Sequence, residues 1–570
     1  MEYILSKYQK AIIDAYIKTQ DNLFISARAG TGKTFLLTEI AKHIDTYSVF
    51  LAFNKSIQQE IATKITNPKF KTYTFNGLAY SILLKNMEEK HPKIKVVLDN
   101  FKTQKIVQKI LDKYIKRKLS WEEKNDYIEE ISAVWEMCKC TLTNIEDEEA
   151  IQNLIRIHGF FEYVDEPDNL LEWLKDIKSE NFRMVIEDGI INFSDQLYIT
   201  VNQLRDKEWV VPPYLMFYNI LVDEAQDTNR CQQVLVFFLK RKGARCIFVG
   251  DKFQAIYAFS GADAHAYETI KTMHNCKEFL LPINYRCGKN HLKLVNQKWK
   301  DIGIEPAPDA IDGQVKKIYI NRLFDIVQEG DFILSRKNSD LIEIALRLLK
   351  TGKSIYIKDK EIVNKTLKFV KRHSKKSETI HELRSQIVFE QRQNKKKQEK
   401  LEELLQKGEI NAEELNAVDF NAGYLDILEC VVALIDNYIS EYKYSNKVND
   451  FLDYIPKKLN TEDKQGCIVC TSIHQAKGLE ADNVFILNEA REFFEFARTS
   501  EQRQQEKNLS YVALTRAKQN LYLVKGTLDN NEDSDYFDNG DYDDQECLVS
   551  EEELKNSDLF DDLDGLGVYV

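Results

Sequence analysis

The sequence lacks any apolar run near the roughly 20 residues that a membrane-spanning helix needs, so no membrane span is expected. Its first residues, 1–7, do not show the basic and then apolar pattern of a secretory leader. The ten cysteines are scattered, and the close pair Cys467 and Cys470 stands in a strand-like run that points the two side chains to opposite faces. These absences argue against disulfides and cysteine metal sites, and they predict a soluble protein of a reducing, cytoplasmic compartment.

A net positive charge is also lacking, because the 570 residues carry a formal net charge of −12. The acidity is concentrated in residues 529–570, which hold sixteen acidic residues and one lysine, so residues 1–528 carry a net charge of +3. The charge of the whole chain therefore does not exclude a nucleic-acid partner. The length exceeds what one hydrophobic core supports and predicts several domains.

The stretch from Asn22 to Ile40 carries the strongest chemical signal. An apolar strand runs into a turn of small residues, and a helix is expected after Gly32. Backbone N–H groups in such a turn can surround a phosphate, Lys33 can reach the β- and γ-phosphates of ATP, and Thr34 can hold Mg²⁺. The alternative is an ordinary glycine-rich turn, since the first glycine of the usual consensus is Ala27 here. The predicted phosphate-binding loop consists of Ala27, Arg28, Ala29, Gly30, Thr31, Gly32, Lys33 and Thr34.

Two further apolar strands end in polar residues. The strand 218–222 is followed by Asp223 and Glu224, a pattern that predicts a Mg²⁺ ligand and a base that orients the attacking water. The strand 245–249 leads to Gln254, which is placed to sense a γ-phosphate. An acidic surface turn is the alternative for the first pair, and a phosphate loop in the same chain makes it the weaker one.

The rest of the chain alternates between α/β and helical segments. Residues 86–190 show long charged helical patterns and predict an inserted helical subdomain. A second α/β unit begins with a strand at 331–335 and a helix at 339–350, and it continues with strands near 467–471, 484–487 and 521–524. Residues 360–450 interrupt this unit with a basic, glutamine-rich segment. Such a segment either follows a phosphate backbone or is simply a solvated helix.

Eight segments, in order, resemble the motifs of the UvrD/Rep-like branch of superfamily 1 DNA helicases, and most closely those of the F-box DNA helicase group. The segments are 26–34, 52–55, 74–79, 223–227, 250–263, 284–286, 471–480 and 511–518. The resemblance implies an α/β fold with two RecA-like P-loop NTPase domains, parallel sheets and an inserted helical subdomain in each. The implied first RecA-like domain is 1–85 with 191–283, and its helical insert is 86–190. The implied second RecA-like domain is 284–359 with 451–528, and its basic helical insert is 360–450. An acidic tail, 529–570, follows.

The same resemblance assigns roles around ATP and Mg²⁺. It places Asp223 on the metal, Glu224 at the catalytic water and Gln254 at the γ-phosphate, with two arginine fingers from the second domain. Gln9 would contact the adenine edge, Tyr285 would stack on the base and Glu480 would reach the ribose. The implied arginine fingers are Arg286 and Arg516.

Contacts with DNA are implied as well. Tyr257 and Phe259 match aromatic residues on which this family stacks bases, and core packing is the alternative because their spacing puts both on one face. His474 matches a position of the family that contacts the DNA backbone, and a structural histidine is the alternative. Asn76, Ser260 and Ala481 depart from the family pattern and put unwinding strength in question. The further implied DNA contacts are Asn54, Thr74, Phe75 and Thr471.

The resemblance implies an ATP-dependent helicase that moves 3′→5′ along single-stranded DNA and acts at single-strand/duplex junctions in repair, recombination or replication. One alternative is a translocase that strips recombination proteins from single strands and unwinds little. Another is a nucleotide-gated switch in a larger assembly. The acidic tail predicts disorder, with a docking peptide for a protein partner or a mimic of the DNA strand as alternatives.

Overall fold

The structure is a computed structural model, and the chain divides into two units, Met1–Pro282 and Ile283–Val570. None of the helices in the part of the chain that it describes is long and apolar enough to cross a bilayer. The predictions for Phe259, Ser260 and the tail 529–570 lie outside the described residues. Those residues are 5–158, 160–161, 166–257, 261–263, 265–374, 379–406, 421–442, 446–459, 466–488 and 500–526.

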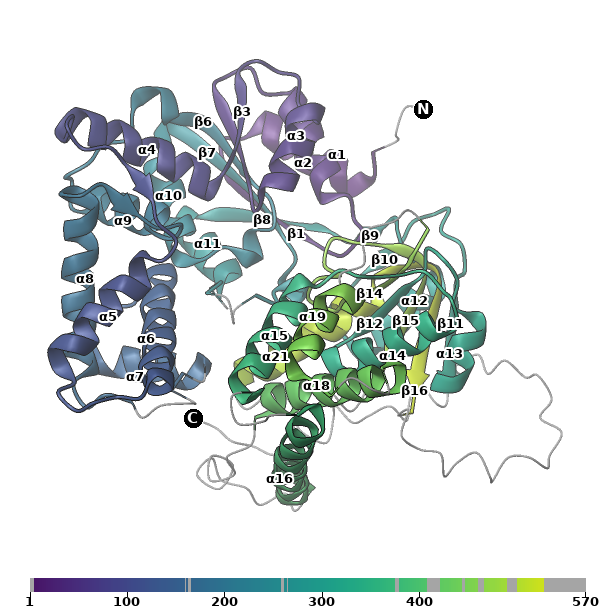
Figure 1. Ribbon diagram of the computed structural model, residues 1–570. Helices are drawn as coiled ribbons and strands as arrows, with labels where there is room; N and C mark the ends of the chain where they lie inside the picture. The colour runs from purple at the N-terminus through teal and green to yellow at the C-terminus, as the bar shows by residue number, and fades with distance from the viewer. Residues whose placement is uncertain are drawn as a thin grey trace. The chain divides into compact units, whose positions relative to one another are not determined.

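A six-stranded sheet, wholly parallel, forms the centre of the first unit, with the strand order β3-β2-β6-β7-β1-β8 (Figure 1). Parallel strands are buried on both faces, which explains the continuous apolar runs in the sequence. The strands are β1 (Asn22–Ala27), β2 (Ser48–Ala52), β3 (Phe70–Thr74), β6 (Phe217–Val222), β7 (Lys240–Gly250) and β8 (Cys276–Leu281).

Alternate residues of these strands enter two different cores. Leu23 and Ile25 of β1 pack with helices α1, α2 and α3 on one face of the sheet, whereas Phe24 packs on the other face. Because side chains alternate along a strand, one sheet supports both cores. The helices of the first face and the two that follow β6 and β7 are α1 (Lys7–Lys18), α2 (Lys33–Lys42), α3 (Lys55–Lys64), α10 (Arg230–Phe238) and α11 (Ala266–His274).

The helical part of the first unit shares the second of these cores without a break. Phe24 and Phe248 of the sheet belong to the same buried cluster as Trp135 of α6 and Trp173 of α8. In Figure 1 these helices extend from the sheet beyond α4 and α9. The elements are α4 (Phe75–Lys90), β4 (Val97–Leu98), α5 (Lys102–Tyr114), α6 (Trp121–Thr141), α7 (Glu148–His158), α8 (Leu170–Ile186), β5 (Ile190–Ile191) and α9 (Asp195–Arg205).

A second parallel sheet, of order β11-β16-β15-β12-β14-β13, forms the centre of the second unit. The expected α/β fold with parallel sheets in two domains is therefore confirmed. A short parallel pair, β9 with β10, precedes this sheet. The strands are β9 (Ile283–Asn284), β10 (Glu305–Pro306), β11 (Gln314–Tyr319), β12 (Phe332–Ser335), β13 (Ile355–Ile357), β14 (Ile468–Ser472), β15 (Ala481–Leu487) and β16 (Ala517–Lys525).

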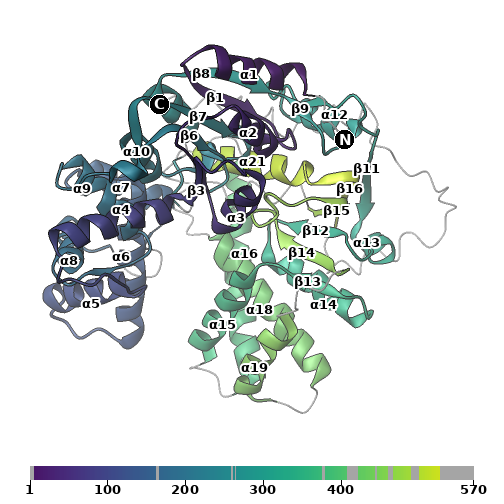
Figure 2. The same cartoon turned by 90° about the horizontal axis from the view of Figure 1, so that it is seen from above.

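Helices from the basic interruption gather on the β13–β14 side of this sheet (Figure 2). Some of their basic residues are paired: Arg384 contacts Asp436, and Lys395 contacts Glu429 at 3.3 Å. The helices of the second unit are α12 (Lys289–Lys298), α13 (Ile320–Ile326), α14 (Asn338–Lys350), α15 (Lys360–His373), α16 (Ile380–Gln406), α18 (Ala422–Glu441), α19 (Val448–Leu459) and α21 (Ser500–Leu514).

Candidate functional site

The glycine-rich turn connects β1 to α2 and has the backbone that a phosphate loop needs. Gly30 and Gly32 both adopt positive φ angles, 64° and 74°, which residues with a Cβ rarely adopt. Gly32 is also the N-cap of α2, so the helix begins at Lys33 with its free N–H groups next to the turn. The Thr31 hydroxyl donates to the carbonyl of Arg28 at 2.8 Å and closes the loop. This geometry is suited to an anion.

Two acidic residues after β6 contact the start of α2. The Nζ atom of Lys33 lies 2.9 and 3.1 Å from the two carboxylate oxygens of Glu224. The Thr34 hydroxyl donates to Oδ2 of Asp223 at 3.1 Å. Glu224 itself has a φ of 50°, an uncommon value for a residue with a side chain that signals a constrained position. The folded chain therefore brings together two pairs of residues that are about 190 positions apart.

Charge and burial shift the pKa values of this group. Burial alone would lower the pKa of Lys33, but Glu224, Asp223 and Asp251 more than offset it and raise that pKa. Burial and the negative charge of Glu224 raise the pKa of Asp223 to about 6, although Lys33 acts in the opposite direction. Asp223 is thus a carboxylate whose charged form gains from a cation placed beside it.

Gln226 connects the acidic pair to the neighbouring strand, and sequence reasoning assigned it no role. Its amide nitrogen donates to Glu224 at 2.6 Å, and its amide oxygen accepts the N–H of Asp251 at 2.9 Å. Asp251 follows β7 directly and leads into the short helix that ends at the buried Gln254. In the sequence, the only indication of this role is that Gln226 lies two residues after Glu224.

Gln9 also lies beside the phosphate loop. It is 3% exposed, and its carbonyl oxygen accepts the N–H of Ser6 at 2.9 Å in the capping box of α1. Its amide nitrogen is the part nearest the loop, since a Cβ built on Gly32 would lie 4.0 Å from it. The structure thus places the amide nitrogen of Gln9 near the loop, while its amide oxygen stabilises the start of α1.

A second cluster forms in the second unit around Glu480. Its carboxylate contacts Nε of Arg286 at 2.6 Å and Nζ of Lys518 at 2.9 Å. Arg516 is 1% exposed, and its guanidinium donates to the carbonyls of Val512 and Leu479 at 2.8 and 3.1 Å. It also donates to the Thr515 hydroxyl at 3.0 Å.

Tyr285 stands in a turn that Asn284 organises. The side-chain amide oxygen of Asn284 accepts the backbone N–H groups of Arg286 and Cys287 at 2.8 and 2.7 Å. Asn284 is fully buried, whereas Tyr285 is 49% exposed. The turn therefore presents an aromatic ring on the surface, next to Arg286.

The candidate DNA-binding residues of the first unit fall into two groups. Asn54 and Thr74 are N-caps of α3 and α4, where their side chains accept N–H groups at 2.9 and 3.1 Å. Phe75 starts α4 but is 2% exposed and belongs to the core, so the structure gives its ring no surface to offer a base. Tyr257 lies nearly parallel to Phe53, with ring centroids 5.9 Å apart. Phe53, which is 37% exposed, was not among the predicted residues.

Thr471 lies near the end of β14 in the second unit, and His474 follows two residues after that strand. Thr471 is fully buried, and its hydroxyl lies 3.4 Å from the carbonyl of Ser472. Burial, together with the positive charges of Arg336, Lys365 and Lys477, lowers the pKa of His474 to about 3. His474 is therefore a neutral imidazole among three cations.

Two protein-family models match this chain. The model for the UvrD/REP helicase N-terminal domain matches residues 5–275, and the model for the UvrD-like helicase C-terminal domain matches residues 468–524. The first match contains the phosphate loop with Asp223, Glu224 and Gln254, and the second contains Glu480 and Arg516. Seven of the eight predicted segments therefore lie within matched regions, and the segment 284–286 lies between the two.

Individual relatives are DNA helicases by name. F-box DNA helicase protein 1 of Schizosaccharomyces pombe is 27% identical over 91% of this chain and 57% of its own length. ATP-dependent DNA helicase PcrA of Bacillus subtilis is 22% identical over 90% of this chain and 82% of its own. DNA helicase II of Escherichia coli is 22% identical over 59% of this chain and 46% of its own. The chain thus spans little more than half of the first of these relatives.

Proposed function

The chain belongs to the UvrD/Rep helicase family, and from this membership we propose that it is an ATP-driven DNA helicase that moves 3′→5′ along single strands. The observation that supports the proposal best is the pairing of Lys33 with Glu224 and of Thr34 with Asp223. These contacts join the phosphate loop to the acidic pair within one unit. The direction of movement and a role in repair, recombination or replication belong to the proposal.

The residues present fit ATP with Mg²⁺. The two glycines of positive φ and the start of α2 form a cradle for phosphate groups, which a Cβ at either position would strain. The hydroxyl of Thr34 and the carboxylate of Asp223 are the oxygen donors that Mg²⁺ prefers, and Mg²⁺ is commonly held by one or two carboxylates together with substrate phosphates. ATP supplies the phosphoryl group whose hydrolysis drives movement.

Each of the chain's own side chains then has a defined task. Lys33 exchanges its contact with Glu224 for phosphate oxygens, which frees the Glu224 carboxylate to accept a proton from water. Gln226 holds one oxygen of that carboxylate and so fixes its direction. Arg286 and Arg516 are the proposed donors to the γ-phosphate, and Glu480 holds Arg286 through their 2.6 Å ion pair.

Single-stranded DNA is the proposed track, with single-strand/duplex junctions as the place of unwinding. Phe53 and Tyr257 offer stacked aromatic rings, and base stacking does not depend on sequence. Asn54 and Thr74 sit at helix N-termini, where backbone N–H groups favour phosphate. This combination suits a motor that moves over any sequence.

Unwinding of tailed duplexes tests the proposal. With ATP and Mg²⁺, the full chain is expected to separate a duplex with a 3′ single-stranded tail and to leave one with a 5′ tail intact. Lys33→Ala is expected to abolish unwinding, because Arg28, the other basic residue of the loop, is buried and donates to the Ser26 hydroxyl and the Ala27 carbonyl. Lys42→Ala is the matched control on the same helix, since this lysine is 67% exposed and pairs only with Glu39 in the described structure.

Other outcomes separate the alternatives. Release of proteins from a single strand without duplex separation would point to a stripping translocase. Hydrolysis of ATP that does not respond to DNA would point to a nucleotide-gated switch. Preference for the 5′ tail would contradict the proposed direction and leave the ATPase assignment intact.

A further inference from the structure

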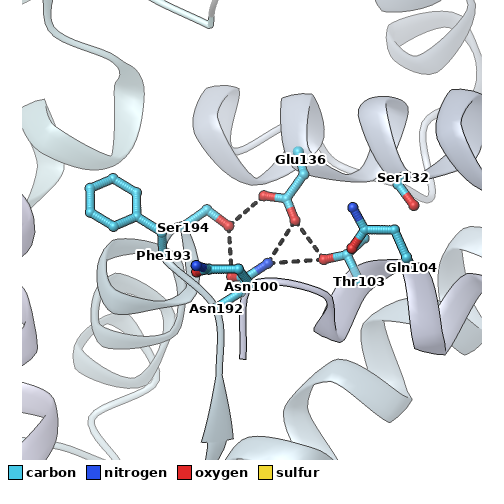
Figure 3. A pocket seen from close by; sticks show the side chains of 8 residues that line it. All are labelled: Asn100, Thr103, Gln104, Ser132, Glu136, Asn192, Phe193 and Ser194. Atoms are coloured by element: carbon cyan, nitrogen blue, oxygen red, sulfur yellow. Dashed lines mark hydrogen bonds between the residues drawn. The ribbon is translucent and has the colours of Figure 1, made fainter. Parts of the chain in front are cut away.

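A polar hollow of about 240 Å³ opens in the helical part of the first unit. Side chains from α5, from α6 and from the segment between β5 and α9 line it, as Figure 3 shows. Its volume is below the roughly 300–1,000 Å³ of sites for drug-sized ligands. The hollow thus has room for one small planar group rather than a nucleotide.

Glu136 is the central charged group of this hollow. One carboxylate oxygen accepts from the Thr103 hydroxyl at 2.6 Å, the Asn192 amide at 2.8 Å and Lys139 at 2.8 Å, and the other accepts from Ser194. Figure 3 shows the carboxylate pointing from α6 towards Thr103, Asn192 and Ser194. The side chain is 34% exposed, so the fixed carboxylate retains a face open to the hollow. Its second oxygen, with one donor in the described structure, can accept another hydrogen bond.

Other polar groups around the hollow have no hydrogen-bond partner among the described residues. The Ser132 hydroxyl is buried and makes no hydrogen bond in the described part of the chain. The exposed amides of Asn100 and Gln104 likewise bond to none of the described residues. A buried hydroxyl without a partner is unfavourable, and a polar ligand can satisfy it. The hollow therefore combines one strong acceptor with amides that both donate and accept.

The hollow lies next to the proposed DNA-binding residues of the same unit. The Asn76 amide donates to the carbonyl of Phe193 at 3.1 Å, and Asn76 is two residues after Thr74. The Phe193 ring is 62% exposed, and in Figure 3 it points away from the polar side chains at the rim. A strand that follows Thr74 and α4 would therefore pass close to the hollow.

We propose that this hollow takes up one unpaired base of the bound strand and prefers bases with an exocyclic amino group over thymine. A carboxylate accepts hydrogen bonds from such an amine, and Asn or Gln amides pair with base edges that carry a donor beside an acceptor. Thymine has no amino group, and its single ring donor, N3–H, lies between two carbonyl oxygens that the Glu136 carboxylate repels. The inference rests on the proposed function, because it requires that the chain binds single-stranded DNA.

Equilibrium binding to two single strands of equal length tests the inference. One strand contains only thymine, and the other alternates cytosine with thymine, so neither forms a duplex. The full chain is expected to bind the mixed strand roughly fivefold or more tightly, as one specific edge contact allows. In Glu136→Gln and in Gln104→Ala the ratio of the two Kd values should fall towards one.

Gln108→Ala is the matched control, because Gln108 is also an exposed glutamine of α5 but does not line the hollow. It should keep the ratio of the parent chain. Should Glu136→Gln fail to fold, Ser132→Ala is the second variant, since it removes only a hydroxyl without a partner and is expected to reduce the ratio.

The outcomes separate this inference from the proposed function. Equal affinities for both strands in the parent chain, or a ratio unchanged in every variant of the hollow, would overturn the inference alone. Failure to bind the all-thymine strand would overturn the proposed function and the hollow with it. Competition by free deoxycytidine that removes the preference would show that the hollow also takes the nucleoside from solution, and an unaffected preference would restrict it to bases of a strand.

Discussion

Replacing Asp195 with asparagine should destabilise the first unit more than any surface change. Asp195 is fully buried at the start of α9, where its carboxylate lies 2.7 Å from Lys102 and 3.3 Å from Lys139. Both lysines are also fully buried. Asn181 and the N–H of Asn192 complete the set, each donating at 3.0 Å. One carboxylate thus neutralises cations from α5 and α6 and joins both helices to α9.

The loss of unfolding free energy in Asp195→Asn follows from the buried charges that remain. Lys139 keeps Glu136 at 2.8 Å, but Lys102 loses its only carboxylate among the described residues. Removing one partner of a buried ion pair typically costs about 3–5 kcal/mol. Burial already lowers the pKa of Lys102, so loss of its proton in the variant limits the cost to the lower part of that range. For a unit of this size, about 3 kcal/mol lowers Tm by roughly 6–12 °C.

Thermal unfolding followed by tryptophan fluorescence measures this effect, because four of the five tryptophans belong to the first unit. Asp188→Asn is the control: that carboxylate is 39% exposed and pairs with Arg183 at the surface, so its loss should cost less than about 1 kcal/mol. If Asp195→Asn shifts Tm no more than the control does, the buried carboxylate does not hold the helical part in place.

Three further predictions concern the site and the second unit. In Gly250→Ala the new Cβ would lie 2.8 Å from the Gln226 amide oxygen, so the variant should displace Gln226 and reduce ATP hydrolysis by up to about 10²-fold, measured as kcat. Phe53→Ala and Tyr257→Ala should each weaken single-strand binding by about 1–3 kcal/mol, or roughly 5- to 150-fold in Kd, measured by titration. Because the folded pKa of His474 is about 3, only the unfolded chain takes up its proton as pH falls below about 6.5, so unfolding free energy should drop between pH 7 and pH 5 in the parent chain and less in His474→Gln.

Each of these three predictions has an outcome that would contradict it. A Gly250→Ala variant with the kcat of the parent chain would show that Gln226 does not position Glu224. Tyr319→Ala, at a residue that is 75% exposed in the second unit, should leave the Kd unchanged, and an equal loss there would remove the special role of Phe53 and Tyr257. Identical pH profiles for His474→Gln and the parent chain would mean that His474 has the same pKa in the folded and the unfolded chain.

The sheets and the ends of their strands could be predicted from the sequence. Parallel strands buried on both faces appear as continuous apolar runs, and the residues after them meet at one edge. For this reason Lys33, Thr34, Asp223 and Glu224 were found without a structure. The contacts between them depend on the strand order, which no single run encodes.

The buried cluster around Asp195 could not be predicted in this way. Lys102 and Asp195 are 93 residues apart, and a charged residue in an amphipathic helix normally indicates a solvated face. Phe75 is the reverse case, a residue that was predicted to contact DNA and is buried. It stands beside Thr74 in the sequence, yet its ring lies in the core. Which side of a helix start faces solvent is decided by tertiary packing, and the motif carries no information on it.

Hydrolysis of ATP by Glu224→Gln, with and without single-stranded DNA, shows whether Glu224 is the base that accepts a proton from the attacking water. The substitution keeps the shape of the side chain and the room around Lys33 but removes the carboxylate that would accept a proton from water. In Glu224→Gln, DNA-stimulated hydrolysis should fall by at least about 10²-fold, while ATP still binds. DNA-stimulated turnover that persists at the rate of the parent chain would contradict the assignment of Glu224 and the site built around it.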